Sequence, residues 1–167
     1  SYLVADGAAV RGVYRELPAE LVGEPVEDWG DALIIPAFVD AHVHAPQYLN
    51  AGIGMDEELL PWLERRTFPL EARFADAAFA SRAYRAFLRE LWRQGTLRFV
   101  AFGTVHAPAT WELMRLADAA GFTALVGKVN MDRNAPASLA EDPARSLGET
   151  EELASRAREE LAHVGFI

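Results

Sequence analysis

The sequence predicts an α/β protein with parallel strands, preceded by a short segment rich in β structure. Three observations carry this prediction. Short apolar runs at residues 38–44, 97–105 and 123–129 have the length and composition of strands. Longer stretches at 76–93, 109–120 and 149–163 read as helices and alternate with these runs. Strands joined through helices pair in parallel with right-handed crossovers, so residues 36–167 are expected to form successive β/α units.

Residues 1–35 are expected to form a small β meander in a domain of their own. Runs at 2–4, 12–14 and 33–35 have the composition of short strands. Turn-forming residues separate these runs: Gly7, Pro18, Gly23, Pro25 and Gly30.

Two helices are predicted between the first and second strands of the β/α region. The first covers 55–65, and Pro69 is expected to interrupt the helical pattern because proline disrupts a helix interior. Asp76 is predicted to cap a long helix that continues to about Arg93 and stops at Gln94-Gly95. Apolar residues at helical spacing predict its buried stripe: Phe79, Ala83, Phe87, Leu88 and Leu91.

The remaining chain continues the alternation. The strand at 97–105 is expected to close on His106, and the next helix to end at Gly121. Pro136 and Pro143 mark a loop, and Ser146 or Thr150 is expected to cap the helix over 149–163. Residues 164–167 then begin a new apolar segment. An open sheet and the first part of a barrel both fit, since a closed (β/α)8 barrel needs eight strands and roughly 250 residues.

Composition excludes several classes of protein. The chain has 167 residues and a net charge of −9, which disfavours a nucleic-acid partner. It lacks cysteine, so any metal must be held by His, Asp or Glu. Its sequence holds no apolar run long enough for a membrane span and no secretory signal, so a cytoplasmic location is expected. The opening Ser1 and the closing apolar segment suggest part of a longer protein.

His42 and His44 form the pattern with the clearest chemistry. Side chains at i and i+2 of a strand point to the same face, so both imidazoles are expected together at the strand's C-terminal end. Neutral imidazole is a good zinc ligand, and barrel active sites lie at this end. A bare His-x-His also arises by coincidence. The preceding strand, Asp40 and Gln47 favour a metal site.

Residues 36–48, Pro-Ala-Phe-Val-Asp-Ala-His-Val-His-Ala-Pro-Gln-Tyr, resemble the first metal motif of the amidohydrolase superfamily. The Ala-Pro-Gln-Tyr end is similar to guanine deaminases in particular. Similar blocks at 52–56, 59–64, 67–74, 103–106 and 126–134 extend the resemblance over about residues 33–150. Ala37 stands where many relatives have Gly, and Leu97-Arg98 where a Thr-rich run is more usual.

The resemblance implies a (β/α)8 barrel that begins in 36–167 and a flanking β-sandwich to which 1–35 belong. It implies that a homodimer hydrolyses guanine to xanthine and ammonia with a zinc-activated water, iron being an alternative metal. By resemblance, His42 and His44 are metal ligands and Gln47 contacts the base. A later His, an Asp, a proton-shuttling Glu and an Arg-Phe segment are expected beyond Ile167.

Other residues admit two interpretations each. Trp62 and Leu63 line an aromatic slot for the base, or pack a helix against the barrel. A structural role is favoured for His106 over one in orienting a metal ligand. Lys128 is not expected to be a carbamylated bridging ligand, and Asp132 is expected to order a loop.

Three functional hypotheses follow. The first is a guanine deaminase of which this chain is the N-terminal portion. The second is a related amidohydrolase that deaminates another ring, such as a pterin, a triazine or cytosine. The third is an inactive fragment or a small α/β binding module, because two His ligands leave a tetrahedral zinc site half built.

Overall fold

The computed structural model describes residues 1–7 and 9–167, which divide into two compact units, Ser1–Ile35 and Pro36–Ile167. In the smaller unit, β1 (Tyr2–Asp6) and β2 (Ala9–Tyr14) pair antiparallel, and the 3-10 turn η1 (Ala19–Leu21) follows. The predicted third strand is wrong. Leu33, Ile34 and Ile35 are exposed, and no strand in the described part of the chain pairs with them. A strand is stabilised by cross-strand contacts, which these residues lack.

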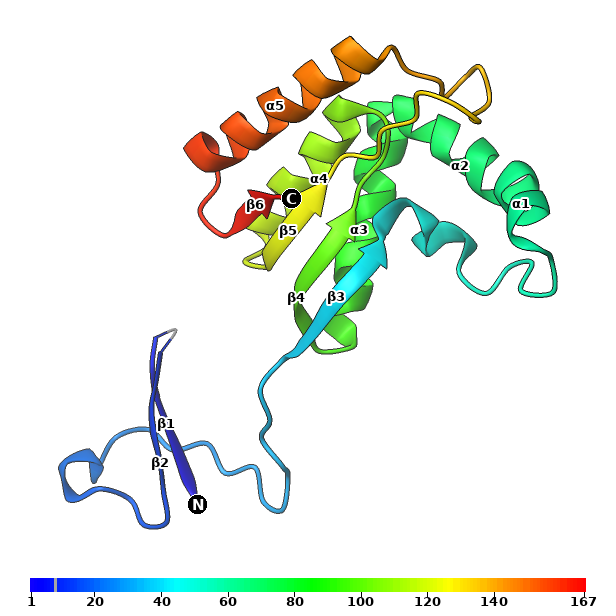
Figure 1. The fold of residues 1–167 in the computed structure, drawn as a ribbon. Coiled ribbons are helices and arrows are strands. Elements are labelled where there is room, and N and C mark those ends of the chain that lie inside the picture. Colours follow the sequence, from blue (N-terminus) through cyan, green and yellow to red (C-terminus); the bar gives the residue numbers. More distant parts are fainter. Residues whose placement is uncertain (8) are drawn as a thin grey trace. The chain divides into compact units, whose positions relative to one another are not determined.

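The larger unit is built on four parallel strands in the order β3-β4-β5-β6. These strands are β3 (Phe38–His44), β4 (Thr96–Phe102), β5 (Thr123–Gly127) and β6 (Val164–Phe166). The helices α3 (Ala77–Arg93), α4 (Ala107–Ala119) and α5 (Pro143–Glu160) connect them (Figure 1). Each strand pairs with the next one along the chain, as in the first units of a barrel. The predicted parallel α/β fold is confirmed, and the apolar segment expected at 164–167 contains β6.

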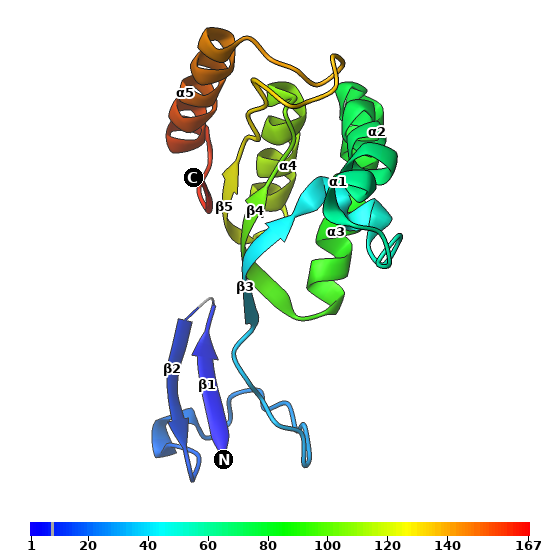
Figure 2. The ribbon, with the colours of Figure 1, turned by 45° about the vertical axis from the view of Figure 1, so that its right-hand side comes forward.

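The core lies between one face of this sheet and its helices. Phe99 on β4 is 2% exposed, and its ring centroid lies 5.9 Å from Phe87 on α3 and 5.7 Å from Phe122. Residues of the opposite face stay accessible, with Phe102 40% and Leu125 42% exposed. Side chains alternate between faces along a strand, so the sheet has one packed face and one open face. Figure 2 shows α3 and α4 beside the strands in a second view.

The helical segment before α3 differs from the prediction. It consists of α1 (Leu59–Trp62), the π-helix η3 (Leu63–Thr67), α2 (Phe68–Ala72) and the 3-10 turn η4 (Arg73–Ala75). Pro69 does not interrupt it. The π turn precedes Pro69: the Phe68 N–H donates to Leu63 O, and the helix continues into α2 with Pro69 at its start.

The helix caps explain one confirmed and one wrong boundary. The Asp76 carboxylate accepts from the N–H groups of Ala78 and Phe79 at 2.8 and 3.2 Å, so the predicted cap of α3 is confirmed. Helix α5 begins at Pro143, six residues before the predicted 149. Its cap is Asp142, which accepts from the Arg145 N–H at 2.9 Å, and Pro143 stands at the first helical position. Ser146 and Thr150 therefore lie inside the helix.

The described residues, 1–7 and 9–167, include no helix with the length and apolar character that a membrane crossing needs.

Candidate metal and substrate site

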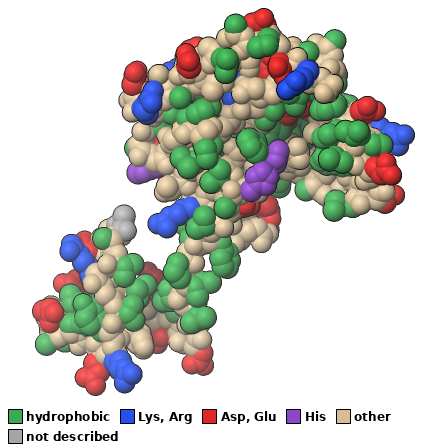
Figure 3. Space-filling view, in the orientation of Figure 1, with side chains coloured by type: hydrophobic (Ala, Val, Ile, Leu, Met, Phe, Trp, Pro, Cys, Tyr) green, Lys and Arg blue, Asp and Glu red, His purple; other side chains and the backbone are tan. Residues whose placement is uncertain are grey.

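His42 and His44 lie at the C-terminal end of β3, on the open face of the sheet. Their ring centroids are 5.2 Å apart, and Phe102 lies 5.6 Å from His42 and 4.9 Å from His44. A register shift between Asp40 and Val43 places one extra residue in β3, and the Asp40 carboxylate accepts from the His42 N–H at 3.0 Å. This bulge fixes the backbone just before the two imidazoles. Histidine side chains reach the surface of the larger unit among hydrophobic ones (Figure 3).

The chemistry of the pair suits a metal ion. Burial, and then the charge of His42, lower the pKa of His44, which favours the neutral imidazole that a metal binds. Both rings lie on one side of β3 within reach of a common point. In the described part of the chain, no three His, Asp or Glu side chains lie close enough together to hold a metal ion. The two histidines thus fit a metal centre as two of its ligands, and a tetrahedral site needs more.

Gln47 belongs to the same site. It stands on the 3-10 helix η2 (Ala45–Asn50), which follows β3 directly. Its Nε2 lies 3.4 Å from His44 Nδ1. A cavity of about 360 Å³ is lined by both histidines, Gln47, Tyr48, Phe87 and Leu91. An amide that both donates and accepts hydrogen bonds therefore stands beside the two imidazoles.

Trp62 and Leu63 are not among the residues that line this cavity. The Trp62 indole N–H donates to Ile53 O at 2.8 Å, and a Cβ on Gly54 would approach the indole Cδ1 to 3.0 Å. Gly54 also has a φ of +71°, so the turn and the indole fit closely only with glycine there. The polar end of Trp62 thus holds the preceding turn, and half-buried Leu63 follows in the π-helix.

The structure has a buried carboxyl group next to the end of β4 that the sequence analysis does not predict. Glu71 on α2 is 5% exposed; its Oε1 accepts from Thr104 Oγ1 and, at 2.9 Å, from the Val105 N–H. Burial raises the pKa of Glu71, against the effects of these two bonds and of the charge of His106. One signal for it exists in the sequence: Thr67, Leu70, Glu71 and Phe74 share one helical face.

Glu71 is expected to make stability depend on pH. A carboxyl whose pKa is higher in the folded than in the unfolded chain binds its proton more tightly when folded. The contribution of Glu71 to the free energy of unfolding therefore declines as pH rises above 4.5, the ordinary pKa of a glutamate. Glu71→Gln keeps an acceptor for Thr104 and Val105 but cannot ionise. The variant's Tm minus the wild-type Tm is expected to increase from about pH 4 to about pH 8 in thermal denaturation.

Glu160→Gln, at an exposed position on α5, is the matched control and should show no such trend. A difference for Glu71→Gln that stays constant or falls with pH contradicts this account of Glu71.

His106 caps α4 through its backbone, because its carbonyl oxygen accepts from the N–H groups of Ala109 and Thr110 at 3.0 Å. Its Nε2 is buried and has no hydrogen-bond partner among residues 1–7 and 9–167. Lys128 follows β5 and is buried, and Asp132 is an exposed loop residue 3.9 Å from the Arg133 guanidinium. None of the three lines the cavity of His42 and His44.

Comparisons with known proteins give a consistent result. A model of the amidohydrolase family matches residues 33–165. The guanine deaminase of Dictyostelium discoideum is 41% identical over 133 residues, which are 80% of this chain and 30% of that protein. That of Escherichia coli is 39% identical over 131 residues, 78% of this chain and 30% of that protein. The chain thus spans about 30% of the length of these curated relatives.

A solved structure is similar over nearly the whole chain. It is the crystal structure of guanine deaminase from C. acetobutylicum with bound guanine in the active site. The TM-score is 0.93 and the identity 40%, over 99% of this chain and 39% of that one. The parallel sheet and its helices therefore match part of a larger enzyme.

Proposed function

This chain belongs to the amidohydrolase family, and on that premise we propose that the whole protein is a guanine deaminase, which hydrolyses guanine to xanthine and ammonia. One observation carries the proposal: the chain matches a guanine-bound guanine deaminase at a TM-score of 0.93 and 40% identity. The proposed N-terminal domain, residues 1–35, would be part of a β-sandwich, and 36–167 would be the first units of the barrel.

The metal in this proposal is zinc, with His42 and His44 as two of its ligands. Zinc supplies a water that is acidic enough to ionise near neutral pH. The chain's own residues prepare the site. His44 is favoured in its neutral form by burial, which lowers its pKa, and Asp40 fixes the backbone at His42. The paired imidazoles are nitrogen ligands, and imidazole suits zinc. The same nitrogen ligands also suit iron, which metal analysis would distinguish.

Gln47 is proposed to orient the substrate. Its amide presents both a donor and an acceptor, which matches the mixed edge of guanine. It lines the same cavity as the two histidines. The proton for the leaving ammonia would come from a carboxyl group beyond Ile167, as the resemblance implies, and Trp62 and Leu63 stay proposed as part of the wall around the base.

Replacing Gln47 tests this role. Gln47→Ala in the whole protein is expected to lower kcat/KM for guanine by about 5- to 150-fold, since an unpaired polar edge costs about 1–3 kcal/mol. Most of the change should be a rise in KM. Glu160→Gln is the control, because Glu160 is exposed on α5 and does not line the cavity of His42 and His44. Equal effects of the two variants on KM would contradict the assignment.

A panel of aminated rings tests the substrate. Guanine should be turned over with the highest kcat/KM, ahead of cytosine, a pterin and an aminotriazine. A zinc-loaded whole protein that prefers one of the other rings would be a related deaminase and would contradict the proposal.

A cytoplasmic homodimer is proposed for the whole protein, as the resemblance to guanine deaminases implies. Light scattering after size-exclusion chromatography tests the dimer, and cell fractionation tests the location.

A further inference from the structure

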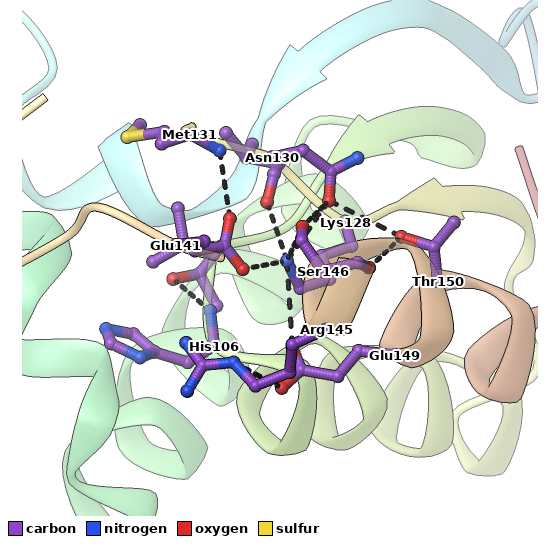
Figure 4. Close-up of polar contacts among 12 residues, drawn as sticks. His106, Lys128, Asn130, Met131, Glu141, Arg145, Ser146, Glu149 and Thr150 are labelled. Carbon is purple, nitrogen blue, oxygen red and sulfur yellow. Dashed lines mark hydrogen bonds and ion pairs between the residues drawn. The ribbon is translucent and has the colours of Figure 1, made fainter. Parts of the chain in front are cut away.

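A fully buried charge follows β5, outside the site of His42 and His44. The Lys128 side chain is 0% exposed and forms an ion pair with Glu141, whose side chain is 6% exposed. The Lys128 ammonium also donates to Val129 O, Asn130 Oδ1 and Ser146 Oγ, each at 3.1 Å. Figure 4 shows Asn130, Glu141 and Ser146 around the Lys128 ammonium. A buried charge is tolerated only with such complete pairing.

Glu141 uses its second oxygen to close a loop. Its Oε2 accepts from the Met131 N–H at 2.9 Å, and its own N–H donates to Met131 O at 2.8 Å. Residues 132–140 therefore form a loop whose two ends, Met131 and Glu141, are hydrogen-bonded to each other. Asn130 Oδ1 also accepts from Ser146 Oγ at 2.6 Å. Lys128 thus joins the end of β5, the closed loop and the first turns of α5.

The loop 131–141 lies at the C-terminal edge of the sheet, where parallel α/β proteins place their ligand sites. It packs inward through Leu139, which is 2% exposed. Leu139 and Glu141 face Phe74 and His106 across a cavity of about 300 Å³. Phe74 lies in η4, in the last turn of the helical segment 59–75 that also carries Trp62. The loop therefore packs near the end of the helical segment that carries Trp62, which is proposed as part of the wall around the base.

A buried ion pair adds little net stability, because apolar residues of the same volume often replace it without loss. A buried ion pair can instead hold the segments that carry its two charges in one arrangement. We infer that Lys128 is a positioning residue, whose ammonium holds the loop 131–141 in one arrangement and so shapes the rim at which guanine enters. This inference rests on the proposed function. Lys128 does not line the cavity of His42 and His44, so its loss is expected to raise KM and leave kcat nearly unchanged.

The test combines proteolysis with kinetics on the whole protein. Arg133 lies within the loop and its side chain is 84% exposed, so trypsin reports loop opening at this bond. Lys128→Met should increase the rate of cleavage after Arg133 at least about tenfold. KM for guanine should rise at least about fivefold, and kcat should stay within about twofold. Glu160→Gln breaks the exposed pair with Arg156 at 3.0 Å and should change none of these values.

Lys128→Met leaves Glu141 buried without its partner, so a second variant guards against misfolding. The double variant Lys128→Met/Glu141→Gln removes both charges, keeps an acceptor for the Met131 N–H and should fold, yet its loop should still be cleaved faster than in the wild type. Wild-type cleavage rates in both variants would overturn the inference, as would a loss of kcat without a change in KM. The proteolysis needs no guanine. If the whole protein fails to deaminate guanine, the proposed function and the guanine-rim role both fail, while cleavage still decides whether Lys128 fixes the loop.

Discussion

Replacing His44 with alanine in the whole protein is expected to lower kcat/KM for guanine by more than about 100-fold. Loss of residues that merely support metal ligands costs roughly 10- to 100-fold, and a ligand should matter more. His44 is one of two histidines at the end of β3, and burial lowers its pKa, which favours the neutral imidazole that binds a metal. The metal content, measured by elemental analysis, and kcat/KM, measured by steady-state kinetics, should both fall.

His163→Ala is the matched control for this variant. His163 is exposed just before β6, and its N–H donates to the Asp118 carboxylate at 2.7 Å, a contact that alanine keeps. Metal content and activity should be unchanged in that control. A His44→Ala protein with full metal and full activity would remove His44 from the metal centre.

Phe99→Ala is expected to cost about 3–5 kcal/mol of the free energy of unfolding, the usual range for a buried phenylalanine. Phe99 is 2% exposed and contacts the rings of Phe87 and Phe122, so its loss leaves a cavity between β4 and α3. That cost is a large part of the stability of a typical domain. Urea denaturation of the chain measures it.

Phe102→Ala provides a control in the same strand. Phe102 points to the open face and is 40% exposed, so truncation should cost less than about 2 kcal/mol. Equal losses for Phe99→Ala and Phe102→Ala would contradict the assignment of one packed and one open face.

The parts of the fold that could be predicted are those whose signal is local. Alternating apolar runs and helical spacing lie within single segments, and the Asp76 cap needs only the residues beside it. Two local signals were misinterpreted. Pro69 predicts an interruption of a helix and Pro143 predicts a loop, yet each stands at the start of a helix in the structure. Asp142 before Pro143 was the stronger signal for the start of α5.

The site residues that can be predicted are likewise those close together in the sequence. His42, His44 and Gln47 lie within six positions, so their pattern can be recognised in the sequence. The bond from Val105 to Glu71 joins residues 34 positions apart, and that from Lys128 to Ser146 spans 18. Such contacts depend on how helices pack across the end of the sheet. No spacing rule in a single sequence specifies them, so the buried carboxyl and the Lys128 network emerge only from the structure.

The central claim is that the histidine pair belongs to a metal-dependent guanine deaminase, and one measurement tests it most directly. The metal-loaded whole protein is incubated with guanine, and xanthine and ammonia are quantified. The account predicts equal amounts of both products, loss of the reaction on chelation, and recovery when zinc is restored. These 167 residues alone should yield no xanthine, because two histidines do not complete the ligand set. A zinc-bound whole protein that leaves guanine unchanged would contradict the account.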